Sequence, residues 1–405
     1  MKVYFSGISG TGIGPLAELA QDAGCEVCGS DLQAGAVAKE LEERNISVSY
    51  NQDGSFLKQC QEETPIDWFV YTSALPKNHP ELALAQELGI RTSKRDAFLA
   101  NLVEQNNLKM IAVAGTHGKT TTVSMLIWAF NQLNIPVSYL VGTTLPWANS
   151  GHFDKKSEFF VYEADEYDRN FLAYHPYIAA ITTVDYDHPD IYPTRGDYSA
   201  AFEQFRSQSN IVVENTTINP AITLIGELRR KDASIALEAI QKALPDIPSE
   251  DIINALNRFP GTGRRFERIV DGVYSDYGHH PEEIKATLEM AKELCQRDNY
   301  AGVAAIYQPH QNVRQHEILH EYREAFLAAD KVFWLPTYLV RENPNLRVLS
   351  PEDLISELQN KEIAEPAEAN EELAAKLKQL HQDNWLIVLL TAGPADAWLR
   401  NIFAD

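Results

Sequence analysis

Residues 109–122, KMIAVAGTHGKTTT, constrain the fold more than any other stretch of the chain. An apolar run is followed by a turn with two glycines, and then Val123, Leu126 and Phe130 recur at helical spacing. A helix that begins at such a turn points unpaired backbone N–H groups and the positive end of its dipole at one place, where an anion binds. The stretch therefore predicts a buried strand, a phosphate-binding loop and a helix.

The side chains of this loop suit a nucleotide. Lys119 supplies a positive charge for the β- and γ-phosphates of ATP, and the Thr120 hydroxyl is an oxygen ligand for a bridging magnesium ion. The usual pattern, G-x-x-x-x-G-K-[ST], would place its first glycine at Val113, whereas the chain has Gly115. We interpret the loop as a shortened variant that binds ATP. The alternative is a strand-to-helix turn without a ligand.

Length and composition limit the class of protein. A chain of 405 residues has room for two or three domains, and 44% hydrophobic and 23% charged residues are typical of a soluble globular protein. The net charge of −22 disfavours nucleic-acid and acidic-membrane partners. No apolar run approaches the roughly 20 residues of a membrane span. We expect a cytoplasmic protein, a monomer or weak homodimer, whose anion sites are local pockets.

The N-terminal stretch has the glycine pattern of a dinucleotide-binding fold. A strand at residues 3–6 runs into GISGTG, in which Gly7, Gly10 and Gly12 allow a tight turn and close approach to a diphosphate. A second strand ends before Asp31, at the place of an acid that binds a ribose hydroxyl. This pattern alone allows NAD, FAD or a nucleotide sugar as the ligand.

A further strand is expected at residues 67–72. It places Ser73 and Ala74 at the carboxyl end of a strand, where such folds bind ligands. The polar run EQNN that follows predicts a domain boundary near residue 107.

Two apolar strands of the next domain run into acidic clusters. Residues 159–162 lead into EADEYD, which begins at Glu163, and residues 178–183 lead into DYDH, which ends at His188. Carboxylates and an imidazole at strand ends beside a phosphate loop are where a metal–nucleotide site belongs. We expect Glu163 and His188 to join Thr120 as ligands of Mg²⁺ or Mn²⁺. The alternative, a solvated acidic loop, is stronger for the other acids of the two clusters.

The last third of the chain alternates strands and helices, which predicts a parallel sheet covered on both faces. Expected strands are residues 272–276, 302–307, 332–335 and 385–390, with helices at 281–294 and about 317–328. The acidic, alanine-rich segment 361–378 is predicted to be a solvated surface helix.

The predicted fold class is α/β in three domains. They are a Rossmann-like domain over residues 1–107, a central P-loop ATPase domain with a parallel sheet over 108–262, and a Rossmann-like C-terminal domain over 263–405.

Eight motifs of the chain, in this order, resemble the Mur ligase family: GISGTG, GSD, TSAL, AGTHGKTTT, EADEYD, DYDH, PGTGRRF and DYGHHP. The resemblance covers nearly the whole chain. It implies an ATP-dependent ligase of peptidoglycan precursor synthesis that joins L-alanine to UDP-N-acetylmuramic acid through an acyl phosphate. Alternatives are a recycling ligase that attaches a murein peptide to the same sugar, and a non-catalytic sensor that binds the UDP-sugar or nucleotide. An NAD-dependent dehydrogenase would leave the phosphate loop unexplained.

The resemblance also implies roles for individual residues. The UDP-sugar would lie against Gly7, Gly10, Gly12, Asp31, Ser73 and Ala74. ATP would be bound by Gly115, Thr116, His117, Gly118, Lys119, Thr120, Thr121, Arg265 and Asp276. Magnesium would be bound by Thr120, Glu163 and His188, and catalysis would depend on Lys119, Glu163, His188 and Arg265. The amino acid would be bound by Tyr277, His279, His310 and Arg314. The alternatives are a surface pair or interface salt bridge for Arg264 and Arg265, and a structural turn at His279 and His280.

The sequence departs from the family pattern in three places. Gln311 stands where family members usually have arginine, directly after the histidine of Q-P-H. In place of the G-x-H-N-x-x-N stretch near adenine, the chain has GELRRKD, with Leu228, Arg229 and Asp232. The region around residues 210–226 is also short. We therefore expect adenine recognition to be rebuilt, or weaker, in this chain.

Overall fold

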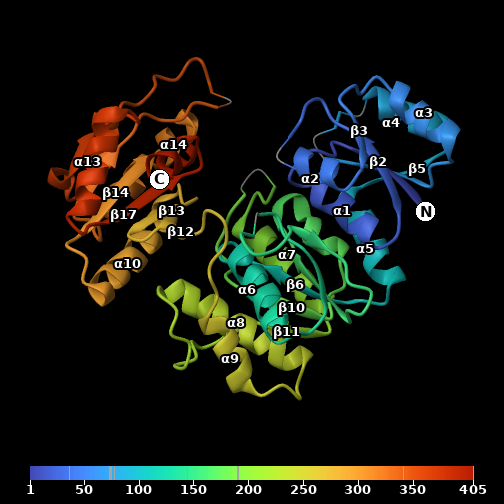
Figure 1. Ribbon diagram of the computed structural model, residues 1–405, viewed down its shortest axis with the longest axis horizontal. Coiled ribbons are helices and arrows are strands. Elements are labelled where there is room, and N and C mark those ends of the chain that lie inside the picture. The colour runs from blue at the N-terminus through green and yellow to red at the C-terminus, as the bar shows by residue number, and fades with distance from the viewer. Residues whose placement is uncertain are drawn as a thin grey trace. The chain divides into compact units, whose positions relative to one another are not determined.

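The computed structural model describes residues 1–35, 37–72, 75–76, 78–143, 145–188, 191–340 and 342–404. Each third of the chain is built on one β-sheet with helices (Figure 1). The thirds group into two compact units, of which the first comprises Met1–Ile222 and Lys231–Phe259, and the second Thr223–Arg230 and Pro260–Asp405. The predicted α/β fold in three domains is confirmed.

The N-terminal sheet has five parallel strands in the order β3-β2-β1-β4-β5. Its strands are β1 (Lys2–Ser6), β2 (Glu26–Ser30), β3 (Ser47–Ser49), β4 (Trp68–Tyr71) and β5 (Arg91–Lys94). Its helices are α1 (Gly14–Asp22), α2 (Ala38–Glu43), α3 (Ser55–Glu63), α4 (Pro80–Glu87) and α5 (Arg95–Gln105). Ser6 pairs with Ser30 and Tyr71, so the glycine loop after β1 and Asp31 after β2 begin at one sheet edge.

The central sheet has the order β11-β10-β6-β9-β7-β8, and all neighbours are parallel except β7 and β8. Its strands are β6 (Lys109–Ala114), β7 (Val137–Leu140), β8 (Gly151–His152), β9 (Phe159–Glu163), β10 (Ile178–Ile181) and β11 (Ile211–Val213). Its helices are α6 (Lys119–Gln132), η1 (Tyr167–Ala173), α7 (Arg195–Ser207), α8 (Glu227–Ala243) and α9 (Ser249–Asn257). Because β6 lies between β9 and β10, the phosphate loop and both acidic segments leave the same edge of the sheet.

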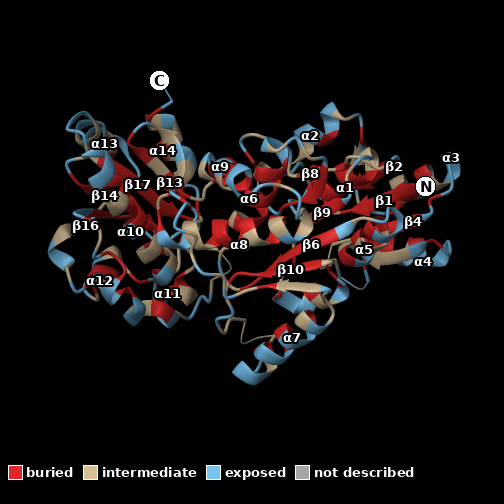
Figure 2. Cartoon of the chain, turned by 90° about the horizontal axis from the view of Figure 1, so that it is seen from below, coloured by how far each residue is buried: buried red, intermediate tan, exposed pale blue. Residues whose placement is uncertain are grey.

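The apolar runs that predicted these strands are buried. Figure 2 shows β1, β6 and β10 as buried strands, and in β6 and β10 almost every side chain is covered. One hydrophobic cluster continues from Phe5 and Trp68 in the first sheet to Phe160 in the second and Phe202 on α7. This shared core explains why the first two sheets belong to one compact unit.

The C-terminal sheet has the order β12-β13-β17-β14-β15-β16, with β12 antiparallel to β13 and the other pairs parallel. Its strands are β12 (Glu267–Val270), β13 (Val273–Asp276), β14 (Val303–Gln308), β15 (Lys331–Trp334), β16 (Ala364–Pro366) and β17 (Leu386–Thr391). Its helices are α10 (Pro281–Asp298), α11 (Asn312–Ile318), η2 (Leu319–Glu324), α12 (Pro351–Ile355), η3 (Lys361–Ile363), α13 (Glu371–Gln382) and α14 (Ala395–Ile402). Alternate residues of β14 and β17 pack with α10 on one face and with α13 and α14 on the other.

Two helix predictions in this part were wrong. Segment 361–378 contains the turn η3 and the edge strand β16 before α13 begins at Glu371, because Pro366 cannot lie inside a helix. The helix is also not wholly solvated, since Leu373 and Leu377 belong to a buried cluster with Ile387 of β17. The helix expected at about 317–328 is also different. The α-helix α11 lies earlier and ends at Ile318, and the chain continues as the 3₁₀ helix η2.

Among the described residues, no helix is both long enough and apolar enough to cross a bilayer.

We expect Leu377→Ala to lower the free energy of unfolding of the C-terminal part by about 2–5 kcal/mol, because Leu377 is fully buried. Urea denaturation of the purified variant measures this change. The matched control is Lys378→Ala at the next, exposed position, which should change it by no more than about 0.5 kcal/mol. Equal effects of the two substitutions would contradict the packing of α13 on the sheet.

Candidate functional site

The loop between β6 and α6 has a conformation that requires glycine at two positions. Gly115 has φ +137° and Gly118 has φ +82°. A Cβ at Gly115 would lie 2.2 Å from Thr182 Oγ1, and one at Gly118 would lie 2.4 Å from Asp232 Oδ1. Gly118 is the N-cap of α6, so the first N–H groups of this helix face the loop. This is the backbone geometry of an anion site.

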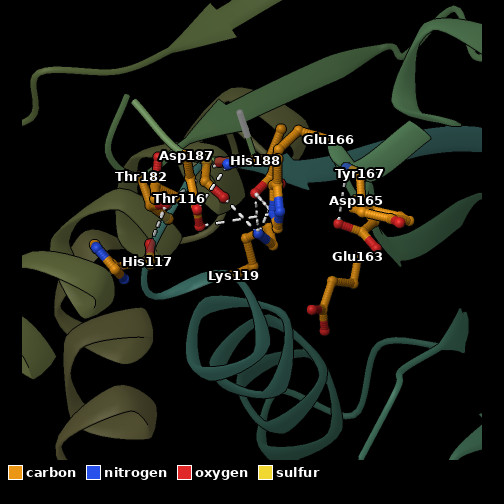
Figure 3. A network of polar contacts seen from close by, with 12 residues as sticks. Thr116, His117, Lys119, Glu163, Asp165, Glu166, Tyr167, Thr182, Asp187 and His188 are labelled. Atoms are coloured by element: carbon orange, nitrogen blue, oxygen red, sulfur yellow. Dashed lines mark hydrogen bonds and ion pairs between the residues drawn. The ribbon is translucent and has the colours of Figure 1, made fainter. Parts of the chain in front are cut away.

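The segment after β10 supports the loop from outside. The Thr116 N–H donates to the Thr183 carbonyl at 2.9 Å, and the His117 N–H donates to Thr183 Oγ1 at 3.0 Å. The Thr116 hydroxyl lies 2.7 Å from the Asp185 carbonyl oxygen and 2.8 Å from the Tyr198 hydroxyl. Thr116 and the His117 backbone therefore hold the loop in shape. The His117 side chain is exposed, and Figure 3 shows it pointing away from Lys119.

Lys119, at the first position of α6, is held by a buried carboxylate. Its ammonium group donates to the Gly115 carbonyl at 2.6 Å and to both Glu166 oxygens at 2.9 and 2.7 Å (Figure 3). An ammonium group has three donors, so these bonds use all of them. Glu166 is only 1% exposed. Burial alone would raise the pKa of its carboxyl, but the contact with His188 and the charge of Lys119 outweigh burial and hold the pKa below its usual range.

Glu166 was missing from the predicted site. It belongs to the EADEYD segment, which also offers Glu163, Asp165 and Asp168, and nothing in the sequence separates these acids. The structure separates them by burial, since Glu166 is buried, Glu163 and Asp165 are partly buried, and Asp168 is exposed.

His188 lies beside Glu166 rather than beside Glu163. Its Nε2 is 3.6 Å from Glu166 Oε1 and 3.6 Å from Asp187 Oδ2. The contact with Glu166 is the main reason why the pKa of this imidazole is raised. The residue has φ +56°, an unusual conformation for a non-glycine residue. His188, Glu166 and Lys119 therefore form one network at the strand ends.

The three predicted metal ligands are only partly brought together. Thr120 Oγ1 donates to Glu163 Oε1 at 3.1 Å, whereas Figure 3 shows Glu163 apart from His188. Within the described part of the chain, no three His, Cys, Asp or Glu side chains form a ready-made cation site. A hydroxyl and a carboxylate are oxygen ligands that suit Mg²⁺, which commonly binds through one or two carboxylates, substrate phosphates and water. Thr120 and Glu163 fit such a site, while His188 would first have to leave Glu166.

The glycine loop after β1 is tied to the end of β2. Gly7 has φ +87°, and its N–H donates to the Ser30 carbonyl at 2.8 Å. The Asp31 carboxylate accepts from the Ser9 N–H at 2.8 Å, so it lies against the loop. The Gly10 N–H closes the turn onto the Gly7 carbonyl at 3.2 Å. The predictions for Ser73 and Ala74 fall outside the described residues.

In the second unit, Asp276 is buried at the end of β13. Its two oxygens accept the N–H groups of Phe266 at 2.7 Å and Gly278 at 2.6 Å. Burial is the main reason why the pKa of this carboxyl is raised. Asp276 thus orders the backbone around it. The sequence predicted only that it binds the ATP ribose, and did not predict this structural role.

Arg264 and Arg265 lie near the same aromatic ring. Their guanidinium carbons are 4.9 and 5.4 Å from the centre of the Tyr277 ring. Arg264 donates to the Thr391 carbonyl at 2.6 Å, whereas Arg265 lies 3.9 Å from Glu283 and keeps about a third of its side chain exposed. The two side chains are similarly exposed, at 30% and 36%, so they differ in the carbonyl contact of Arg264 and not in their exposure.

The four residues predicted to bind the amino acid lie together. The Tyr277 and His279 ring centres are 5.5 Å apart, and those of His279 and His310 are 5.9 Å apart. Burial lowers the pKa of both imidazoles, and the nearby charge of Arg314 lowers it further. His279 also lies 3.6 Å from the Glu283 carboxylate, so the imidazoles share this place with a carboxylate as well as with the Arg314 guanidinium group.

The structure also shows where two of the departures from the family pattern lie. Gln311 is the N-cap of α11 with φ +63°, and its N–H donates to the Tyr338 carbonyl at 2.9 Å. The GELRRKD stretch forms the start of α8, where Leu228 is exposed and Asp232 reaches Gly118 of the phosphate loop.

Three profiles of one family match almost the whole chain. They are "Mur ligase family, catalytic domain" over residues 2–107, "Mur ligase middle domain" over 113–254, and "Mur ligase, glutamate ligase domain" over 264–393. Among curated relatives, the UDP-N-acetylmuramate--L-alanine ligase of Fusobacterium nucleatum is 31% identical, with 87% of this chain and 86% of that protein covered. The ligase of the same name from Syntrophomonas wolfei is 30% identical over 98% of this chain and 95% of that protein.

Solved structures share the fold. A UDP-N-acetylmuramate-alanine ligase of Thermotoga maritima is 21% identical with a TM-score of 0.75, and the similarity covers 100% of this chain and 98% of that one. A murein peptide ligase of Psychrobacter arcticus, also 21% identical, has a TM-score of 0.59 with 100% and 98% of the chains covered.

We expect Glu166→Gln to destabilise the first unit by about 3 kcal/mol or more, because it leaves the Lys119 charge in a largely buried place without its counter-ion. Chemical denaturation of the ligand-free protein measures the change. The matched control is Asp168→Asn in the same segment. Its pair with Lys94 is about half exposed on both sides and contributes no more than about 1 kcal/mol. An unchanged stability of Glu166→Gln would contradict the role given to the pair.

Proposed function

The chain belongs to the Mur ligase family, and on this premise we propose that it joins L-alanine to UDP-N-acetylmuramic acid with consumption of ATP. Two observations support the proposal: curated relatives with this activity in their names match over most of the chain, and Lys119 lies at a glycine loop flanked by acidic strand ends. The reaction would take place in the cytoplasm, early in peptidoglycan precursor synthesis. The protein would act as a monomer or weak homodimer.

The proposed reaction has two steps. An oxygen of the sugar's lactyl carboxylate attacks the γ-phosphorus of ATP, the bond to the bridging oxygen breaks, and ADP leaves. The product is an acyl phosphate. The alanine amine then attacks its carbonyl carbon, phosphate leaves, and the nitrogen loses a proton to give the amide. Such phosphoryl transfer depends mainly on positioning and charge neutralisation.

In the first step Lys119 would exchange partners. Because its three N–H donors are satisfied by Gly115 and Glu166, a phosphate oxygen has to replace at least one of these bonds. Glu166 keeps a second partner in His188 when the lysine turns to the phosphates. The network thus holds Lys119 in place before the nucleotide arrives.

Magnesium, when bound, would neutralise phosphate charge and orient the γ-phosphoryl group. Thr120 and Glu163 would hold it, while the third predicted ligand, His188, would stay with Glu166 as long as Lys119 contacts the phosphates. The loop residues Gly115 to Thr121 would surround the phosphates, and Arg265 and Asp276 would complete the ATP site.

The other two substrates would take the remaining predicted sites. Gly7, Gly10, Gly12 and Asp31, with Ser73 and Ala74, would bind the UDP-sugar. Tyr277, His279, His310 and Arg314 would bind L-alanine, with Arg314 facing its carboxylate.

The direct experiment measures phosphate release from ATP in magnesium buffer with UDP-N-acetylmuramic acid, with and without L-alanine. We expect release that requires both substrates and is matched by the amide product. A murein tripeptide in place of L-alanine tests the recycling ligase. Turnover with the tripeptide alone would reassign the acceptor, and binding of the UDP-sugar without turnover would indicate a sensor.

We expect Lys119→Ala to lower the turnover number by about a hundredfold or more, because one preorganised donor to the transferred phosphoryl group is lost. The substitution also leaves Glu166 buried without its main counter-ion, so loss of folding has to be separated from loss of chemistry. The double variant Lys119→Ala/Glu166→Gln removes both charges. It should be more stable than Lys119→Ala and equally inactive; recovery of turnover in the double variant would contradict the role of Lys119.

A further inference from the structure

Three consecutive residues at the start of α5, in the N-terminal part, contact the central part of the same compact unit. Lys94 lies 3.5 Å from Asp168. Arg95 donates to the Tyr162 hydroxyl at 3.0 Å. The Asp96 carboxylate accepts from the Tyr174 hydroxyl at 3.1 Å and from Arg95 at 3.3 Å. The middle residue of this group, Arg95, has a contact that the other two lack.

That contact is with the glycine loop. Arg95 Nη1 donates to the Gly12 carbonyl at 3.4 Å, and a Cβ at Gly12 would lie 3.0 Å from the same nitrogen. A side chain at this position would therefore press on the guanidinium group, which would have to shift by a few tenths of an ångström. Arg95 therefore fixes the end of the loop that leads into α1.

The opposite side of the guanidinium group holds Tyr162, which is 3% exposed and is the penultimate residue of β9. The Tyr162 hydroxyl also lies 3.4 Å from that of Tyr174, so its position is fixed from two sides. The next residue is Glu163, whose carboxylate accepts the Thr120 hydroxyl at 3.1 Å. An unbroken series of contacts therefore runs from Gly12 through Arg95 and Tyr162 to the start of α6.

We propose that Arg95 is a positioning residue that couples occupancy of the glycine loop to occupancy of the phosphate loop. This inference rests on the proposed function, in which the first loop binds the UDP-sugar and the second binds ATP. The guanidinium group is planar and rigid, so a shift of the Gly12 carbonyl is passed to Tyr162 and hence to Glu163. Each ligand then increases the affinity of the other by the same factor, since linkage is reciprocal.

The experiment measures the coupling factor, which is the ratio of the affinities for one ligand in the presence and in the absence of the other. Calorimetric titration gives the affinity for the non-hydrolysable analogue β,γ-imido-ATP with magnesium, in the absence and presence of saturating UDP-N-acetylmuramic acid. We expect an increase of at least about fivefold in the wild-type protein. The reverse titration, with the sugar nucleotide as titrant, should give the same factor.

Two variants interrupt the series at different points. Arg95→Lys keeps the charge but cannot reach Gly12 and Tyr162 together, and Tyr162→Phe keeps the buried ring but removes the hydroxyl. In both variants the coupling factor should fall to less than about two. The coupling factor of the double variant should be no lower than that of either single variant, because the two residues act through one contact. Lys94→Ala is the matched control: it removes the cation directly before α5 without interrupting the series, and it should keep the wild-type factor.

The outcomes separate this inference from the proposed function. A wild-type protein that binds both ligands and forms the amide without coupling would overturn the inference and leave the function intact. Full coupling in Arg95→Lys or Tyr162→Phe would overturn it as well. A wild-type protein that binds neither ligand would overturn the proposed function. Tyr162→Phe does not touch the glycine loop, so its loss of coupling cannot be ascribed to a damaged sugar site.

Discussion

The buried ion pair between Lys119 and Glu166 is the interaction on which the arrangement of the central site depends. It joins the phosphate loop after β6 to the segment after β9, and through His188 it reaches the segment after β10. A buried pair of charges is stable only when both partners are present and well hydrogen-bonded. The pair therefore fixes three separate stretches of chain at one edge of the sheet, with the lysine held in place before any nucleotide binds.

Much of this could be predicted from the sequence, because the relevant signals are local. The apolar run before Gly115 is β6, and the change to helical spacing after Lys119 is α6. The order of strands in the sheet then brings the acidic clusters to the phosphate loop, as expected for neighbouring parallel strands. Tyr277 and His279 follow β13 and His310 follows β14, and these strands end at the same edge of the sheet with β17 between them.

What could not be predicted depends on contacts between residues far apart in the sequence. Glu166 and Asp168 are both acidic residues of the same segment. Only their burial in the folded protein distinguishes the counter-ion of Lys119 from a half-exposed surface acid. Arg95 gives no signal in the sequence, because its partners Gly12 and Tyr162 lie 83 and 67 residues away. The burial of Leu373 and Leu377 on α13 was not predicted, because most of the residues around them in the sequence are charged or polar. Their spacing of four residues nevertheless places them on one face of a helix. The contact of His188 with Glu166 could not be predicted for a related reason, because the sequence does not show which acid of the EADEYD segment the imidazole meets.

The central claim is that a carboxylate of the bound sugar attacks the γ-phosphorus at the loop that carries Lys119. Transfer of isotope from carboxylate to phosphate tests it most directly. UDP-N-acetylmuramic acid labelled with ¹⁸O in its lactyl carboxylate is turned over with ATP and L-alanine, and the released phosphate is analysed by mass spectrometry. If an acyl phosphate forms, the phosphate carries one carboxylate oxygen, and label appears in it in proportion to the enrichment of the sugar. Unlabelled phosphate accompanying the amide product would contradict the account.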